Sequence, residues 1–176
     1  AVPERLHGVR ILRGVECNII SRDGKLDLPN ELLAILETVI ASAHIVVSPE
    51  KLKSKDNTKM YLKVLENRHV NILGHLENTQ FPVDYETLIP AAKEAGKLIE
   101  INNASFTIAR KGSYQNCLTI MQLLKKYNMP TVINSDAHTA ERVGLVSRAM
   151  ETALEVGIKP ENILNIDYRK IAKFLR

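Results

Sequence analysis

The chain has 176 residues, of which 45% are hydrophobic and 25% are charged, an ordinary composition for one globular domain. Its net charge of +4 is spread along the sequence and only 5% of the residues are aromatic, which disfavours a dedicated nucleic-acid surface. No stretch approaches the roughly 20 apolar residues of a membrane span, and residues 1–5 lack a signal-peptide pattern. We therefore expect a cytoplasmic protein in which Cys17 and Cys117 are reduced.

Short β-rich runs alternate with helical patterns along the whole chain. The expected strands cover residues 10–20, 38–44, 70–74, 98–101, 131–133 and 163–166. The expected helices cover residues 28–36, 56–67, 84–95, 113–127, 139–156 and 168–175, with Asp84 and Thr139 as N-caps. This alternation with short connections predicts a parallel sheet, either open and doubly wound or closed into a barrel. No glycine-rich phosphate loop follows the first strand, which disfavours a dinucleotide-binding fold.

Polar side chains stand at the carboxyl ends of five successive strands. They are Glu16, His44, His75, the pair Asn102 and Asn103, and the pair Asp136 and His138. In a parallel barrel these strand ends converge on one face, and imidazole and carboxylate groups together suit zinc, iron or manganese. The pattern predicts a metal site, although any single histidine at a strand end is more commonly a hydrogen-bonded packing residue. His7 and His69 lack this context, and we expect both at the surface.

Several segments resemble the PHP (polymerase and histidinol phosphatase) family of metal-dependent phosphoester hydrolases. They are Gly-Val-Glu-Cys-Asn at 14–18, Ile-Ala-Ser-Ala-His at 40–44, Ile-Leu-Gly-His at 72–75 and Asn-Ser-Asp-Ala-His-Thr at 134–139. Glu-Ile-Asn-Asn-Ala-Ser at 100–105 and Arg-Lys-Gly-Ser at 110–113 are similar to the small stand-alone bacterial phosphatase branch of the family. The resemblance extends over essentially the whole chain, in order.

The resemblance implies a distorted seven-stranded β/α barrel that holds up to three metal ions, commonly zinc, with manganese or iron as alternatives. Glu16 would bridge two ions, and His44 and His75 would bind one of them. Asp136 would bind the other and His138 the third, and both are expected catalytic residues. A metal-bound hydroxide would hydrolyse phosphate monoesters of small molecules. The substrate-binding residues, whose cations and amides suit phosphate oxygens, would be Asn102, Asn103, Arg110 and Lys111.

The sequence departs from the family pattern at its start and in two loops. The family begins with a His-x-His strand, a further His and a Thr-Asp-His motif, and none of these occurs here. Residues 1–176 therefore resemble the C-terminal two-thirds to three-quarters of a single PHP-type domain. Unpaired strand edges lead us to expect self-association or a missing N-terminal segment that completes the barrel, and weak or no turnover from this chain alone. Substrate specificity cannot be inherited, because Ile45-Val46-Val47 and Leu76-Glu77 replace the usual loop residues.

Two other functions stay open at this point. The same family contains nucleases, so a phosphodiesterase acting on nucleotides or DNA ends is one alternative, which the mild charge and scarce aromatics disfavour. A non-catalytic barrel remnant that serves as a scaffold is the other, indicated by the absent His-x-His strand and the altered loops. The presence of all five expected metal ligands at once argues against such a loss of activity.

Overall fold

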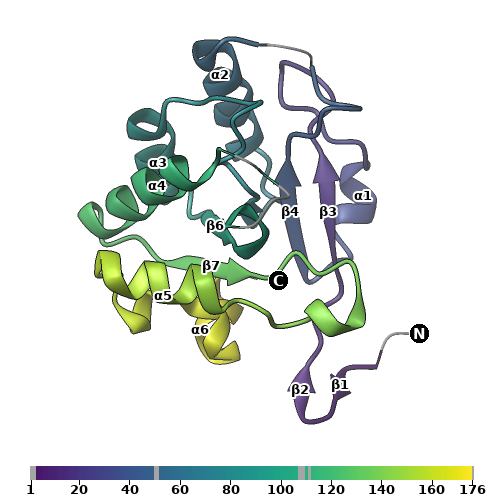
Figure 1. Cartoon of the computed structure of the whole chain (residues 1–176). Helices are drawn as coiled ribbons and strands as arrows, with labels where there is room; N and C mark the ends of the chain where they lie inside the picture. Colours follow the sequence, from purple (N-terminus) through teal and green to yellow (C-terminus); the bar gives the residue numbers. More distant parts are fainter. Residues whose placement is uncertain (1–2, 50–51, 107–109, 111, 176) are drawn as a thin grey trace.

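The computed structural model describes residues 3–49, 52–106, 110 and 112–175. Five parallel strands form one sheet in the order β3-β4-β5-β6-β7. They are β3 (Gly14–Asn18), β4 (Thr38–Ser42), β5 (Ile72–Leu73), β6 (Leu98–Asn102) and β7 (Thr131–Asn134). Two short antiparallel strands, β1 (Arg5–Leu6) and β2 (Val9–Arg10), form a hairpin at the bottom of Figure 1. The predicted α/β fold with a parallel sheet is confirmed.

The helices are α1 (Asn30–Leu33), α2 (Ser54–Leu65), α3 (Tyr85–Glu94), α4 (Tyr114–Lys126), α5 (Ser147–Val156) and α6 (Tyr168–Ile171). Of these, α2, α3 and α4 line one side of the sheet in chain order (Figure 1). On α2, Met60, Tyr61 and Val64 are buried at the spacing of one helical face. Asp84 caps α3 as predicted, because its side chain accepts a hydrogen bond from the Thr87 amide at 3.3 Å.

Apart from the end strand β3, the sheet is largely buried on both faces, which explains why its strands read as apolar runs. All five residues of β6 are buried. Ile99 and Ile101 belong to the main core beneath the helices. Leu98 instead belongs to a second cluster with Val132 and Leu164. Because successive residues of a strand point to opposite faces, the two clusters cover opposite faces of the sheet.

The expected helix from Thr139 to Val156 is wrong in its first half. Residues Ala140–Arg142 form a short 3-10 helix, and α5 begins only at Ser147. Gly144, between these two elements, has a φ of +79°, a left-handed conformation that an α-helix cannot contain. The apolar spacing of the segment therefore continues across a break in the backbone.

The expected strand at 163–166 is also wrong, because a side chain takes the place of strand pairing. Only Ile163 forms an isolated parallel bridge, to Thr131, and Leu164–Ile166 is a 3-10 helix. The Asn165 side chain accepts from the Ile133 amide at 3.1 Å and donates to the Ile133 carbonyl at 2.7 Å. The carboxamide thus satisfies the outer edge of β7 where a neighbouring strand would otherwise pair.

The predictions for His69, His7 and the last helix differ in outcome. His69 is only 7% exposed, so the surface prediction is wrong for it, whereas His7 is exposed as expected. The last helix ends at Ile171 and continues as a 3-10 helix over Ala172–Phe174. Within the described part of the chain, no helix has the length and apolarity needed to cross a membrane.

Candidate metal centre

Three polar side chains meet near the carboxyl ends of β3, β4 and β5. Glu16 lies within β3, His44 follows β4 by two residues, and His75 follows β5 by two residues. The Nε2 atom of His75 lies 3.1 Å from the Nε2 atom of His44 and 3.1 Å from Glu16 Oε1. The distance from His44 Nε2 to Glu16 Oε1 is 3.7 Å. The sequence prediction that these side chains lie together is confirmed, and we call them the metal triad.

The spacing of the metal triad fits a single metal ion. Its three ligand atoms lie within 4.8 Å of one another. Two ligands of one tetrahedral zinc ion, each about 2.0–2.1 Å from it, are separated by roughly 3.3 Å, close to the distances found here. The two imidazole rings meet edge to face with centroids 4.9 Å apart. The Nε2 atom of each ring points toward the Glu16 carboxylate. One carboxylate oxygen with two imidazole nitrogens is a donor set that zinc, manganese and iron accept.

Burial and mutual contacts shift the pKa values of all three side chains of the metal triad. The hydrogen bond from His75 outweighs burial and lowers the pKa of Glu16 to about 2. Burial alone would lower the pKa of His75, but the hydrogen bond to Glu16 raises it above its ordinary value. Burial and the nearby His75 charge lower the pKa of His44. At neutral pH the Glu16 carboxylate is therefore ionised and His44 is neutral, whereas the contact with Glu16 favours the protonated form of His75, so metal binding at His75 would be coupled to proton release.

A second polar group surrounds Asp136, which follows β7. Arg110 Nη2 donates to Asp136 Oδ2 at 2.8 Å, and Asn102 Nδ2 donates to the same oxygen at 3.1 Å. Burial raises the pKa of Asp136, but the Arg110 hydrogen bond and charge outweigh it, so this pKa lies below its usual range. Asp136 is thus held ionised beside a fixed cation.

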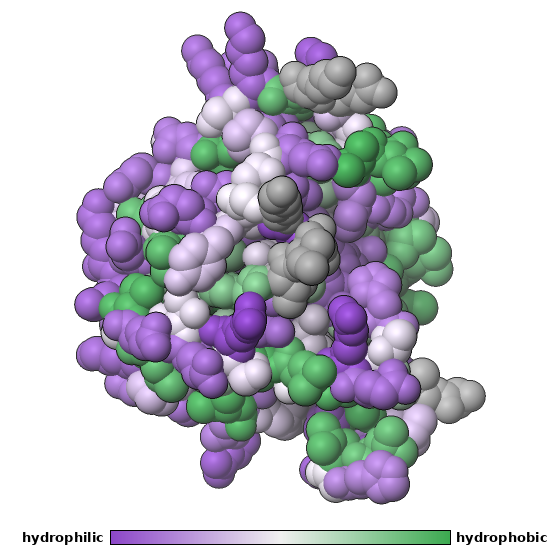
Figure 2. Space-filling view, in the orientation of Figure 1, coloured by the Kyte–Doolittle hydropathy of each residue, from purple (hydrophilic) through white to green (hydrophobic). Residues whose placement is uncertain are grey.

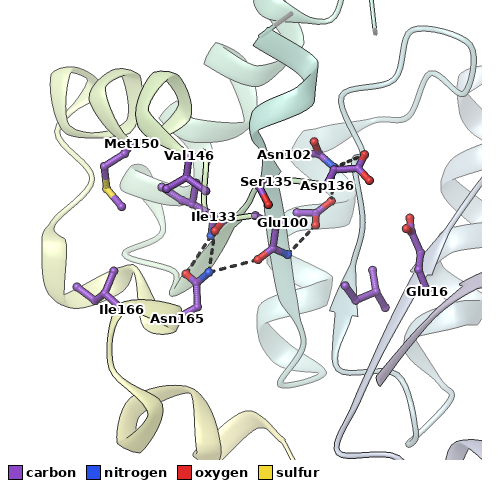
Figure 3. Close-up of a pocket in the computed structure, with 13 residues that line it drawn as sticks. Glu16, Glu100, Asn102, Ile133, Ser135, Asp136, Val146, Met150, Asn165 and Ile166 are labelled. Atoms are coloured by element: carbon purple, nitrogen blue, oxygen red, sulfur yellow. Dashed lines mark hydrogen bonds between the residues drawn. The ribbon is translucent and has the colours of Figure 1, made fainter. Parts of the chain in front are cut away.

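A cavity of about 520 Å³ separates these two groups. Figure 3 shows Glu16 on one side, with Asp136 and Glu100 on the other. The carboxylates of Glu16, Glu100 and Asp136 all line the cavity. Residues of β7, α5 and the C-terminal segment form its remaining walls; they include Ile133, Asn134, Val146, Met150, Asn165 and Ile166. The site is therefore an acidic, partly apolar cavity open to small ligands.

Comparison with known proteins identifies the family. A family model described as PHP-associated matches residues 116–158. A probable phosphatase of Thermoanaerobacter sp. (strain X514) is 41% identical over 99% of this chain and 71% of its own length. Probable phosphatases of Acetivibrio thermocellus (41% identical, 72% of its length) and Clostridium botulinum strain Hall (38%, 71%) also match over 99% of this chain. This chain belongs to the PHP phosphatase family. The resemblance read from the sequence motifs is confirmed.

Of the other expected site residues of this PHP chain, two donate hydrogen bonds to the Asp136 carboxylate, and Asn103 and His138 do not. Asn102 points into the cavity and contacts Asp136. Arg110, which follows β6 in the chain, also contacts Asp136. Asn103 instead accepts a hydrogen bond from the Ala149 amide at 2.9 Å, in the first turn of α5. The His138 side chain is 84% exposed, and its Nδ1 lies 2.9 Å from the Asp136 carbonyl. Lys111 lies outside the described residues.

Two buried carboxylates of this PHP chain are missed by reading the sequence for strand ends. Glu100 is 4% exposed within β6 and accepts hydrogen bonds at the centre of the site. Glu77 is 1% exposed, accepts a hydrogen bond from the Ser105 hydroxyl, and has a pKa that burial raises to about 7. A charged residue inside the apolar run Leu98–Ile101 is a signal that could have found Glu100, whereas the sequence gives no comparable signal for Glu77.

Proposed function

We propose that this chain forms the greater part of a metal-dependent phosphatase that hydrolyses phosphate monoesters of small molecules. The observation that carries the proposal is the metal triad of Glu16, His44 and His75, whose carboxylate lines a cavity that Asp136 also lines. The related proteins named probable phosphatases, each spanned over more than two thirds of its length, support the same activity.

The residues of the chain fit a multinuclear site. The metal triad would hold one ion, zinc with manganese or iron as alternatives, and Asp136 and His138 would contribute to further ions, up to three in the complete site. When bound, such ions supply an activated water and positive charge for the phosphoryl oxygens. Arg110 adds a planar cation beside Asp136, of a kind suited to two phosphate oxygens at once. Asn102 holds the Asp136 carboxylate in place and is proposed to contact substrate with its amide.

The test is hydrolysis by a form of the protein extended to the length of its relatives. We expect p-nitrophenyl phosphate to be hydrolysed in the presence of zinc or manganese, to stop with a chelator and to resume when the metal is restored. Bis(p-nitrophenyl) phosphate should react far more slowly. Equal rates on the diester would favour the phosphodiesterase alternative. Stable metal binding without any hydrolysis would favour the scaffold. For residues 1–176 alone we expect weak or no turnover.

The five-stranded sheet supports a further proposal about how the barrel is completed. We propose that residues 1–176 form a single domain that is part of a distorted seven-stranded barrel. A further segment of the protein or a second copy of the chain would complete the barrel. β3 and β7 are the two ends of the five-stranded sheet, and both contribute residues to the cavity. Where the outer edges of these two strands stay unpaired, they favour pairing with another strand.

Exposed apolar side chains accompany this open sheet. Figure 2 shows them along the right-hand margin of the molecule, over α1, and on the hairpin at the bottom. Leu32 and Ile35 are exposed in and just after α1, and Val46, just after His44, is 93% exposed. Clustered exposed apolar residues indicate contact with another surface. We therefore expect residues 1–176 to sediment as a dimer or larger species at micromolar concentration, and a monomer would contradict self-association.

A further inference from the structure

Two expected metal ligands have an unusual backbone conformation. His75 has a φ of +30° and Asp136 a φ of +53°, in the left-handed region that residues with a side chain seldom adopt. The other non-glycine residues of this kind in the described chain are His7, in the turn of the β1–β2 hairpin, and Asn128, just after α4. Turns tolerate this conformation, but at the site it persists only because the surroundings hold it.

Glu100 provides the contact that holds His75. Its Oε2 atom accepts a hydrogen bond from the His75 main-chain N–H at 2.9 Å. The residue before His75 is Gly74, where an added Cβ would lie 2.2 Å from Ser42 Oγ and 2.8 Å from Ile40 Cγ2. The absence of a side chain at Gly74 thus lets the backbone before His75 lie close against β4.

The same carboxylate leads to Asp136 through one further side chain. Asn102 Nδ2 donates to Glu100 Oε2 at 3.1 Å and to Asp136 Oδ2 at 3.1 Å. The other carboxylate oxygen of Glu100 accepts from Asn134 Nδ2 at 2.7 Å, two residues before Asp136 in the chain. A continuous path of hydrogen bonds therefore joins the metal triad to Asp136, with Glu100 at its centre.

We propose that Glu100 is a positioning residue that fixes His75 and, through Asn102, Asp136 in one common geometry. This inference rests on the metal centre of the proposed function. Glu100 accepts three hydrogen bonds from neutral amide N–H groups, and those contacts use both of its oxygens. It therefore acts by orienting the ligands, as outer partners of metal ligands commonly do.

The neighbouring Asn134 offers a test that exchanges the two groups without removing any hydrogen bond. In Glu100→Gln, the new amide group faces the Asn134 amide group, donor against donor. In Asn134→Asp, two carboxylates face each other. In the double variant, the Asp carboxylate accepts from the Gln amide, and the Gln oxygen remains for His75 and Asn102. A positioning role is restored by this exchange, whereas a direct ligand role is not, because the Gln lacks the negative charge.

The measurement is binding of zinc alone by calorimetry and of cobalt(II) alone by visible absorption, each with the chain of residues 1–176. We expect roughly 10–100-fold weaker zinc binding in each single variant, with a reduced tetrahedral cobalt spectrum. The double variant should return to within about threefold of the parent affinity and to the parent spectrum. Thr131→Val is the matched control, because it removes a buried hydrogen bond between β7 and β6, from Thr131 Oγ1 to the Ile99 carbonyl, away from the site. It should lower thermal stability and leave the cobalt spectrum unchanged.

Each other outcome has a defined meaning. Single variants that bind zinc as tightly as the parent overturn the inference, and so does a double variant as weak as Glu100→Gln. A cobalt spectrum that Thr131→Val changes as much as Glu100→Gln does also overturns it, since general destabilisation then explains the effect. A parent chain that binds neither metal overturns both the inference and the metal centre. Tight metal binding by an extended form that hydrolyses no monoester overturns the proposed phosphatase alone.

Discussion

Replacement of His75 by Ala is expected to weaken zinc binding by at least roughly 100-fold, because changes to outer partners of a metal ligand already cost roughly 10–100-fold. His75 contacts both other members of the metal triad, His44 and Glu16, at 3.1 Å. Its loss leaves a carboxylate and one half-exposed imidazole, too few donors for a stable site. The measurement is zinc affinity in competition with a chelator, together with phosphatase activity of the extended protein, which should be lost.

His69→Gln is the matched control for this experiment. His69 is also a buried histidine, and it lies before β5 where His75 lies after it. Its replacement should leave zinc affinity unchanged even if the chain becomes less stable. Unchanged affinity in His75→Ala would show that the metal triad does not bind the ion. Affinity that falls equally in both variants would show that stability, rather than ligation, is being measured.

Stability is expected to fall as the pH rises from about 4.5 to about 7, because of Glu77. Burial raises the pKa of this carboxyl from 4.5 to about 7, helped by the nearby Glu100 charge and opposed by the Ser105 hydrogen bond and by His75. Between these two pH values the folded chain binds a proton that the unfolded chain has released, so each unit of pH favours unfolding. The full effect is on the order of 3 kcal/mol, complete below about pH 4.5; most of it remains at pH 5, and it is lost by pH 8.

Glu77→Gln should remove this dependence, since the amide keeps an acceptor for the Ser105 hydroxyl and carries no charge to bury. The measurement is the free energy of unfolding in urea at pH 5 and pH 8 for the metal-free chain and the variant. Glu151→Gln, on an exposed position of α5, is the control and should retain the parent difference. Parallel pH profiles for the parent and Glu77→Gln would contradict the assignment.

Much of the fold can be predicted from the sequence because the strands other than β3 are largely buried on both faces. A run such as Leu98–Ile101 has no surface to present, so it stands out as apolar, and the residue that follows it falls at the site edge. The two histidines of the metal triad are predictable for the same reason, since each follows an apolar strand by two residues. His69 is misread because a histidine before a strand has no pattern that reports burial.

The errors arise where side chains or single backbone angles decide the structure. The run at 163–166 has the composition of a strand, but Asn165 uses its carboxamide to pair with Ile133 and the backbone turns instead. Gly144 interrupts an otherwise helical spacing. The role of Glu100 depends on His75 and Asn134, residues distant in sequence whose approach only the folded sheet defines.

The side-chain pairing of Asn165 with Ile133 has a consequence for assembly symmetry. With Ile163 bridged to Thr131, the outer edge of β7 is occupied at two alternate residues, so a strand of another molecule finds its hydrogen-bonding groups taken there. The outer edge of β3 is occupied in a similar way near its carboxyl end, where both main-chain groups of Asn18 bond to Asp27 and Ile19 bridges Leu26. Two copies that met through the remaining part of β3 would use the same surface on each, an isologous contact that closes on itself about a two-fold axis. With both end strands partly occupied, the sheet offers few free hydrogen-bonding groups for head-to-tail growth into fibres.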